Sequence, residues 1–149
     1  MKKITIIIPN YNGLKFLPAC LKALSRQTFQ DFDILVVDNG SEDGSVQWLK
    51  EQQVPSIFLP GNLGFSGAVN VGIRAACSPY VILLNNDTEA EPSYVEELLC
   101  GIQVSPRIFS VSPKMLKMGC KDVIDDAGDM YSLMGWDYQR GVGQVARLY

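Results

Sequence analysis

The chain has 149 residues, 47% of them hydrophobic and 19% charged, which is enough for one globular domain with a buried core. Its net charge of −3 disfavours nucleic acids and anionic membrane surfaces as partners, because both attract a basic protein surface. Since the chain contains no histidine, imidazole metal sites and Ser-His-Asp or Cys-His catalysis are excluded, and carboxylates and amides must carry any chemistry.

The amino end resembles a signal peptide only briefly. Lys2 and Lys3 precede an apolar run, but Pro9 ends that run before it reaches the ~7–15 residues of a signal peptide. No apolar stretch approaches the ~20 residues of a membrane span. We expect a first strand here and a cytoplasmic protein, with peripheral attachment at the inner membrane face as an alternative.

Apolar runs bounded by turn residues alternate with segments of helical periodicity, which predicts a βαβα order. The expected strands are Ile4–Ile8, Phe32–Val37, Ser56–Leu59, Tyr80–Leu84 and Ile108–Val111. Four helices are expected. The first carries Leu17, Leu21 and Leu24, with Pro18 in its first turn, and the second carries Val46 and Leu49 after an N-cap at Asp43. The third carries Val69, Ile73 and Ala76, and the fourth carries Val95, Leu98, Leu99 and Ile102 within 93–104. The fold class predicted is α/β, with a mostly parallel, Rossmann-like sheet and helices on both faces.

The pattern weakens from Lys114 onward into Gly-rich and Asp-rich sequence, where we expect hairpins or loops. We expect a single domain over 1–149, with a nucleotide-binding core at 1–113 and the start of an acceptor-side region at 114–149. The four cysteines are far apart and have apolar neighbours, which predicts reduced, buried thiols; they are Cys20, Cys77, Cys100 and Cys120.

Polar residues collect after the first four strands, in the segments 9–13, 38–45, 61–65 and 85–88. In a parallel sheet these loops meet at one edge, where ligands bind. Each loop by itself is explained by turn formation, because Asn, Asp, Gly and Ser favour turns. Four such loops at one edge favour a polar ligand that carries phosphate.

Two common nucleotide motifs are absent. A dinucleotide-binding turn needs G-x-G-x-x-G after the first strand and a P-loop needs G-x-x-x-x-G-K-[ST], whereas the first turn here reads Pro9-Asn10-Tyr11-Asn12-Gly13. Asp87 at the end of the fourth strand suits Mg²⁺ or Mn²⁺, which take one or two protein carboxylates and fill their shell with water and phosphate oxygens. A turn or cap role for Asp87 is the alternative.

Four segments together resemble the ordered motifs of family 2 glycosyltransferases of the GT-A fold, a resemblance that covers about residues 4–113. They are Ile7–Asn12, Val36–Ser45, Asn62–Ile73 and Leu83–Thr88. The resemblance implies a substrate site of Pro9, Tyr11, Asn12, Asp38, Asn39, Asn62, Gly64, Asn70, Asn86 and Asp87. Pro9 and Tyr11 would line a nucleobase pocket, Asp38 and Asn39 would bind base and ribose, and Asn62 through Asn70 would form a glycine-rich loop beside the diphosphate. Asp87 would be the metal ligand, as the last carboxylate of a D-x-D-like motif.

The chain departs from the family pattern at two positions. Asn39 stands where the family often has a second Asp, and Asn85 replaces the first acidic residue of the D-x-D-like motif. Asn39 contributes no charge toward a base, and the loss of a carboxylate at Asn85 weakens the expected metal site.

The resemblance also implies transfer of a sugar from a dTDP- or UDP-sugar, with a divalent metal and inversion, to a hydroxyl of a glycan or lipid-linked glycan. The variant motifs look most like those of bacterial rhamnosyltransferases of the cell envelope. Inversion needs a general base, which we expect after Tyr149, in a truncated or split protein whose exposed apolar surface favours a homo-oligomer. Asp125, Asp126 and Asp137 suit loop solvation better than catalysis.

Two other classes of function remain open at this stage. A catalytically inactive binding or scaffold module would keep the fold without turnover. A nucleotidyltransferase would share the architecture, but it would need basic residues near the first loop, where only Lys15 stands.

Overall fold

The structure, a computed structural model, describes residues 2–148. The chain divides into two compact units, Met1–Ser93 and Tyr94–Tyr149, which are described separately. This division falls before the expected boundary at 113, and the assignment of 1–149 to one domain stays a prediction.

The first unit is built on a four-stranded parallel sheet with the order β3-β2-β1-β4. Its strands are β1 (Ile4–Asn10), β2 (Phe32–Asp38), β3 (Ser56–Phe58) and β4 (Tyr80–Leu83). The central strand β1 is apolar on both faces and almost wholly buried, as a strand between two layers of helices must be. The predicted fold class is therefore confirmed, together with the first four predicted strands.

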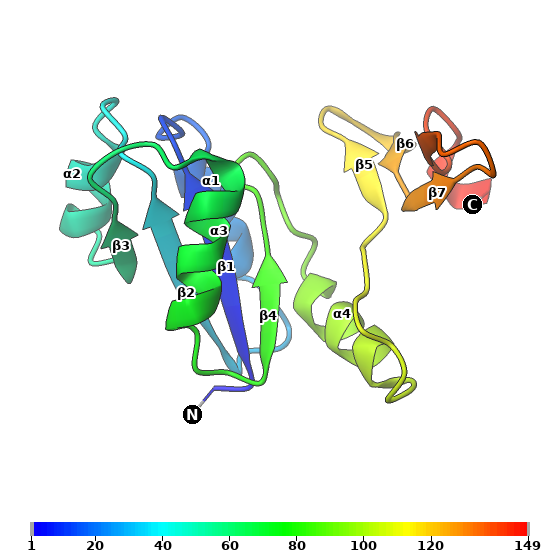
Figure 1. Cartoon of the computed structure of the whole chain (residues 1–149), viewed down its shortest axis with the longest axis horizontal. Coiled ribbons are helices and arrows are strands. Elements are labelled where there is room, and N and C mark those ends of the chain that lie inside the picture. Colours follow the sequence, from blue (N-terminus) through cyan, green and yellow to red (C-terminus); the bar gives the residue numbers. More distant parts are fainter. Residues whose placement is uncertain (1, 149) are drawn as a thin grey trace. The chain divides into compact units, whose positions relative to one another are not determined.

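Three helices alternate with these strands: α1 (Leu17–Leu24), α2 (Ser45–Glu51) and α3 (Gly64–Ala75). Figure 1 shows α3 on one face of the sheet and α1 on the other. Pro18 stands in the first turn of α1, where its missing N–H costs no hydrogen bond. Asp43 accepts the Ser45 N–H at 3.0 Å, so it satisfies a donor at the start of α2, although the N-cap position itself belongs to Gly44.

The face of α3 that packs on the sheet differs from the predicted stripe. Ala68, Val69 and Gly72 are buried, whereas Ile73 is 40% exposed and Ala76 lies past the end of the helix. A Cβ placed on Gly72 would come within 3.0 Å of the Ile7 side chain. Small residues thus let α3 approach β1 more closely than a stripe of large apolar residues would.

The second unit contains α4 (Tyr94–Gln103) and four short strands, β5 (Met115–Lys117), β6 (Cys120–Asp126), β7 (Asp129–Tyr131) and β8 (Asp137–Gln139), before a 3₁₀ turn at Ala146–Leu148. The pairs β5-β6 and β7-β8 are antiparallel, which confirms the predicted hairpins. Val95 and Leu99 of α4 are buried as predicted, and Ile124 of β6 is completely buried.

The predicted strand Ile108–Val111 is wrong. This segment has no regular secondary structure, and Phe109 is almost fully exposed. A strand requires a partner for its backbone hydrogen bonds, and residues 108–111 pair with no other part of the described chain.

The prediction of four buried thiols is correct for Cys20 alone. Cys77, Cys100 and Cys120 are exposed, and all four cysteines are free. No helix among residues 2–148 combines the length and the apolar character needed to cross a bilayer.

Candidate functional site

A cleft of about 380 Å³ opens at the carboxyl edge of the parallel sheet, within the first unit. The chain adds β2 and β3 on one side of β1 and then β4 on the other, so the strand order reverses between β1 and β4. Ligands of open α/β sheets bind at such a reversal, and the volume suits a small molecule. The cleft is lined by Pro9, Asn10, Tyr11, Asn39, Asn62, Gly64, Phe65, Asn85, Asn86 and Asp87.

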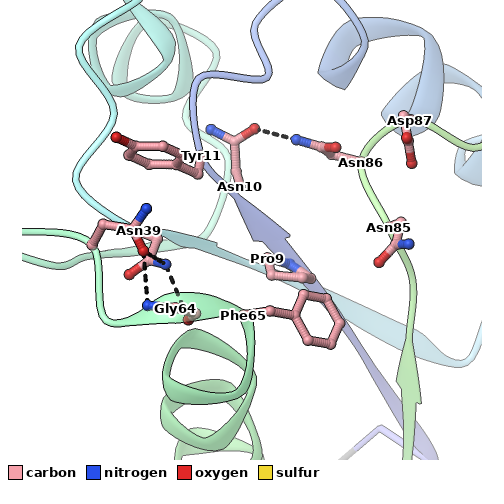
Figure 2. A pocket seen from close by; sticks show the side chains of 10 residues that line it. Pro9, Asn10, Tyr11, Asn39, Gly64, Phe65, Asn85, Asn86 and Asp87 are labelled. Atoms are coloured by element: carbon pink, nitrogen blue, oxygen red, sulfur yellow. Dashed lines mark hydrogen bonds between the residues drawn. The ribbon is translucent and has the colours of Figure 1, made fainter.

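The lining residues come from the ends of the four strands. Figure 2 shows Asn39 and Gly64 on one side of the cleft and Asn85, Asn86 and Asp87 on the other, with Pro9 between them. Seven of the ten predicted substrate residues line the cleft: Pro9, Tyr11, Asn39, Asn62, Gly64, Asn86 and Asp87. The structure thus brings together most of the residues that the sequence singled out.

At the end of β1, one aromatic side chain is exposed and the amide before it is buried. Tyr11 is about half exposed, whereas the neighbouring Asn10 is almost completely buried. Asn12 does not line the cleft. It has a positive φ of 51°, which Asn tolerates better than most residues, and its Oδ1 accepts the Glu42 N–H at 2.8 Å. Asn12 therefore ties this turn to the loop after β2, and its predicted contact with substrate stays a prediction.

Asp38, the last residue of β2, is completely buried and is not part of the cleft wall. Its Oδ1 accepts the Ser41 N–H at 2.9 Å, and its Oδ2 accepts from Asn10 Nδ2 at 2.8 Å. Both carboxylate oxygens are thus used to shape the loop after β2. Direct binding of base and ribose by Asp38 stays a prediction.

The side chain of Asn39 fastens the loop after β2 to the loop after β3. Its Oδ1 accepts the Leu63 N–H at 2.9 Å, while its Nδ2 donates to Asn62 Oδ1 at 2.9 Å and to the Gly64 carbonyl at 3.1 Å. Asn62 Oδ1 also accepts the Gly64 N–H at 2.7 Å. Both the oxygen and the nitrogen of the Asn39 amide are thus hydrogen-bonded within the protein. The structure shows this structural role, and the binding of base and ribose by Asn39 stays a prediction.

Glycine makes the close approach of these two loops possible. Gly40 has a φ of +80°, a conformation that other residues rarely adopt, and a Cβ there would lie 2.7 Å from the Gly61 Cα. A side chain at position 40 would therefore push the two loops apart.

The amino end of α3 faces the cleft through Gly64 and Phe65. Helix amino ends carry unpaired N–H groups and a partial positive charge, which stabilise anions. Phe65 is 59% exposed and was not among the predicted site residues; its place directly after Gly64 in the glycine-rich loop was the available signal. Asn70 lies further along α3, is exposed and does not line the cleft, so its predicted role stays a prediction.

The turn after β4 supplies the acidic side of the cleft. Asn86 Nδ2 donates to Asn10 Oδ1 at 2.7 Å, and the Asn85 carbonyl accepts from Thr88 Oγ1 at 2.7 Å. Asp87 is exposed at the cleft. Asn10 and Asn85 also line the cleft and were not among the predicted site residues; a single amide at a strand end is typical of a turn former.

A buried thiol lies behind this turn. Cys20 Sγ is 3.8 Å from the Asn85 carbonyl. Burial raises the pKa of the Cys20 thiol to about 11, with a smaller increase from the charge of Asp87 and an opposing hydrogen bond from Thr88. Cys20 is therefore protonated at neutral pH, and a thiol is a poor nucleophile and metal ligand.

The carboxylates of this unit do not form a metal cage. The part of the chain that the structure describes contains no group of three or more His, Cys, Asp and Glu side chains able to hold a metal ion. Asp87 is a single carboxylate at the cleft, with the amides of Asn85 and Asn86 beside it in sequence. This donor set fits a hard ion that takes most of its oxygen ligands from water and a bound phosphate group.

Asp43 has a structural role outside the cleft. Slight burial raises its pKa, but hydrogen bonds from Ser45 and from the Leu14 and Ser45 N–H groups outweigh this and lower the pKa below its ordinary value. Its Oδ2 accepts the Leu14 N–H at 2.8 Å. Asp43 thus links α2 to the turn that follows β1.

The carboxylates of the second unit have local surroundings. Asp126 is buried and its Oδ1 accepts the Gly128 N–H at 2.8 Å, which stabilises the turn between β6 and β7. Asp125 and Asp137 are exposed. All three lie in strands and not in loops, Asp125 and Asp126 in β6 and Asp137 in β8, so the expected loop setting is wrong, and the absence of a catalytic role stays a prediction.

Comparisons with known proteins agree with the resemblance. The profile of the family described as Glycosyl transferase family 2 matches residues 5–117. Glycosyltransferase GlyA of Streptococcus pneumoniae is 36% identical over 100 residues, which are 64% of this chain and 14% of that protein. The teichoic acid poly(glycerol phosphate) polymerase of Staphylococcus epidermidis is 32% identical over 95 residues, which are 60% of this chain and 13% of that protein. This chain thus spans a small part of the length of either relative.

The fold is shared with a solved structure. S. aureus TarS 1–349, in complex with UDP-GlcNAc, matches with a TM-score of 0.63 and 23% identity, over 78% of this chain and 38% of that one. At this identity the match supports the arrangement of helices and strands.

Proposed function

The chain belongs to glycosyl transferase family 2, and we propose that its cleft binds a nucleoside diphosphate sugar, whose sugar is then transferred to a hydroxyl acceptor with inversion. The observation that carries this proposal is the position of the cleft. It lies where the strand order reverses, with an exposed aromatic ring at Tyr11, the amino end of α3 at Gly64 and a single carboxylate at Asp87.

Each of these groups suits one part of such a donor. The exposed ring of Tyr11 offers an aromatic face on which a base stacks, a contact worth about 1–3 kcal/mol. The Gly64 N–H is bonded to Asn62 Oδ1, and the N–H groups that follow it in the first turn of α3 suit a diphosphate. In S. aureus TarS, which has the same fold, the bound molecule is UDP-GlcNAc, and this supports a UDP-sugar over the dTDP-sugar that the motifs also allowed.

Asp87 would hold a divalent ion, Mg²⁺ or Mn²⁺, together with the diphosphate of the donor. When bound there, the ion supplies positive charge that offsets the charge of the departing nucleoside diphosphate. The amide groups of Asn85 and Asn86 add no negative charge, so Asp87 alone accounts for the electrostatic attraction at this end of the cleft. Metal affinity is therefore low without nucleotide and rises when the diphosphate is bound.

The acceptor is proposed more broadly, as a hydroxyl of a glycan or lipid-linked glycan of the bacterial cell envelope. The relative from S. epidermidis is a teichoic acid polymerase, which supports an envelope polymer. Rhamnose as the transferred sugar has the support of the motif variant alone.

Calorimetric titration tests the donor site. The protein is titrated with UDP-GlcNAc, a dTDP-sugar and a GDP-sugar, each with and without Mn²⁺. We expect a UDP- or dTDP-sugar to bind and Mn²⁺ to strengthen that binding. Asp87→Asn should abolish the effect of Mn²⁺, because it removes the carboxylate and keeps the size of the side chain.

The control is Glu89→Gln. Glu89 is exposed in the same loop and does not line the cleft, so the same loss of charge should leave the response to Mn²⁺ intact. A protein that bound none of the three donors would refute the proposal and favour a scaffold role.

A further inference from the structure

Asn10 occupies a buried position between the two sides of the cleft. It is the last residue of β1 and only 1% exposed, and it lines the cleft together with its neighbours Pro9 and Tyr11. The sequence does not distinguish Asn10 from an ordinary turn former. Its burial does distinguish it, because a buried amide must find partners for its N–H groups and its oxygen inside the protein.

The Asn10 amide connects the loop after β2 with the turn after β4. Its Nδ2 donates to Asp38 Oδ2 at 2.8 Å and to Ser41 Oγ at 3.2 Å. Its Oδ1 accepts from Asn86 Nδ2 at 2.7 Å, as Figure 2 shows. A single side chain thus bonds to both neighbours of β1 in the sheet order, at the edge where the cleft opens.

The orientation of these amides is fixed by chemistry. A carboxylate only accepts hydrogen bonds, so Asn10 must turn its NH₂ group toward Asp38 and its carbonyl oxygen toward Asn86. Asn86 must then turn its own NH₂ group toward Asn10, which leaves the Asn86 carbonyl oxygen as the group that can contact a ligand or a hydrated cation. The buried charge of Asp38 therefore determines which atom Asn86 offers.

Gly13 gives independent evidence that this contact is built into the fold. A Cβ at position 13 would lie 2.5 Å from Asn10 Oδ1 and closer still to Asn86 Nδ2. Gly13 has no positive φ, so glycine is required here for space and not for backbone conformation. The absence of a side chain leaves room for the bond between Asn10 and Asn86.

We propose that Asn10 is a positioning residue, which fixes Asn86 and the adjacent Asp87 relative to the loop after β2. One nucleotide can then bind through its base and through its diphosphate at the same time. This role rests on the proposed function. Groups that are already held in their binding geometry lose less entropy when the ligand arrives. Asn10 thus acts through its neighbours and needs no contact with the reacting atoms.

The test measures how strongly Mn²⁺ improves UDP binding, as the ratio of the Kd without Mn²⁺ to the Kd with it. Two variants disturb the two sides of the Asn10 amide. Asn10→Asp replaces the NH₂ group that donates to Asp38 by a second carboxylate oxygen and keeps the oxygen that accepts from Asn86. Gly13→Ala displaces the Asn86 amide and leaves the charge of the site unchanged. The loss of one hydrogen bond corresponds to a change of up to about tenfold when both groups are neutral, as for Asn10 and Asn86, and of about tenfold or more when one group is charged, as for Asn10 and Asp38. We expect the Mn²⁺ ratio to fall by about tenfold in both variants.

A double variant tests the direction of the bonds. In Asn10→Asp with Asp38→Asn, the donor and the acceptor exchange places: the new amide donates to the new carboxylate, which still accepts from Asn86. We expect the Mn²⁺ ratio to recover relative to the single variant, even where the change at position 38 lowers the affinity for UDP without metal.

The control is Thr5→Val at the other end of β1. Thr5 is buried and its Oγ1 lies 2.8 Å from Ser78 Oγ, so the variant removes a buried hydrogen bond from the same strand, far from the cleft in the strand register. We expect a lower Tm and an unchanged Mn²⁺ ratio.

Three results would overturn the role of Asn10: an unchanged Mn²⁺ ratio in Gly13→Ala and Asn10→Asp, a double variant that stays at the level of the single variant, or an equal loss in Thr5→Val. If the parent bound no UDP-sugar and no UDP, the proposed function would fail as well. A parent that binds UDP with a Mn²⁺ effect insensitive to these variants would refute the positioning role alone.

Discussion

Asn39→Asp changes one atom of the side chain and should destabilise the protein. Asn39 is 4% exposed, and its Nδ2 donates to Asn62 Oδ1 at 2.9 Å and to the Gly64 carbonyl at 3.1 Å. A carboxylate cannot donate, so both acceptors would face another oxygen. Asn62 and Gly64 are exposed, so water can replace the lost donor, and each lost hydrogen bond then costs about 0.5–1.5 kcal/mol. For the two bonds together we expect about 1–3 kcal/mol.

Thermal unfolding followed by circular dichroism measures this cost. For a chain of this size, 1 kcal/mol corresponds to roughly 2–4 °C, so Asn39→Asp should lower the Tm by about 2–12 °C. The matched control is Asn70→Asp on the exposed side of α3, where the same substitution should change stability by less than about 0.5 kcal/mol. If Asn39→Asp were as stable as Asn70→Asp, the hydrogen-bonding role assigned to the Asn39 amide would be wrong.

Three further outcomes are expected. Gly72→Ala should destabilise the protein by about 1–3 kcal/mol, because the new Cβ would press on the Ile7 side chain of β1. Gly101→Ala in α4, where the atom nearest to the new Cβ is 3.6 Å away, should instead stabilise the helix by up to about 1 kcal/mol. Denaturant unfolding compares the two variants. Cys20 should react with iodoacetamide far more slowly than the exposed Cys120 at pH 8, as mass spectrometry can show. Since burial raises the pKa of Cys20 from 9.0 to about 11, the contribution of this thiol to stability should be complete below pH 9 and lost as the pH rises toward 11. Tyr11→Ala should weaken UDP binding by about tenfold or more in calorimetry, while Tyr11→Phe keeps most of it.

The parallel sheet was predictable because buried strands are apolar on both faces. The β-branched runs of β1 and β2 have no polar face, which few other structures allow. Once the strands were assigned, parallel topology placed their following loops at one edge, and the cleft lies there. The same reasoning fails for a short isolated run such as Ile108–Val111, since a strand also depends on a partner that is distant in sequence.

The cysteines show how little apolar neighbours reveal about burial in a helix. Cys100 directly follows the buried Leu99 in α4, yet it is exposed, because successive helical residues point about 100° apart. Cys20 and Leu24 share one face of α1 and are both buried. Periodicity within the helix predicts burial, whereas adjacency does not.

The sequence alone does not predict which carboxylate of the site is structural and which is exposed to a ligand. Asp38 and Asp87 are both carboxylates at strand ends, but Asp38 is buried among hydrogen bonds and Asp87 is exposed at the cleft. The buried Asp38 lies at the end of a strand between two others and receives a hydrogen bond from Asn10, which is far away in sequence. Such contacts between loops depend on the completed fold.

The preference for asparagine at this edge follows from what an amide can do. Asn10 and Asn39 each donate and accept at the same time, so each can join two loops, whereas an aspartate at either position only accepts. Amides also hold the four strand ends together without adding charge, and like charges gathered at one edge would repel one another. The exposed negative charge of the cleft is thereby concentrated at Asp87. If this reasoning is correct, Asn86→Asp should strengthen Mn²⁺ binding in the absence of nucleotide and, because a carboxylate cannot donate to Asn10, reduce the improvement that Mn²⁺ gives to UDP binding; an increase in both would contradict it.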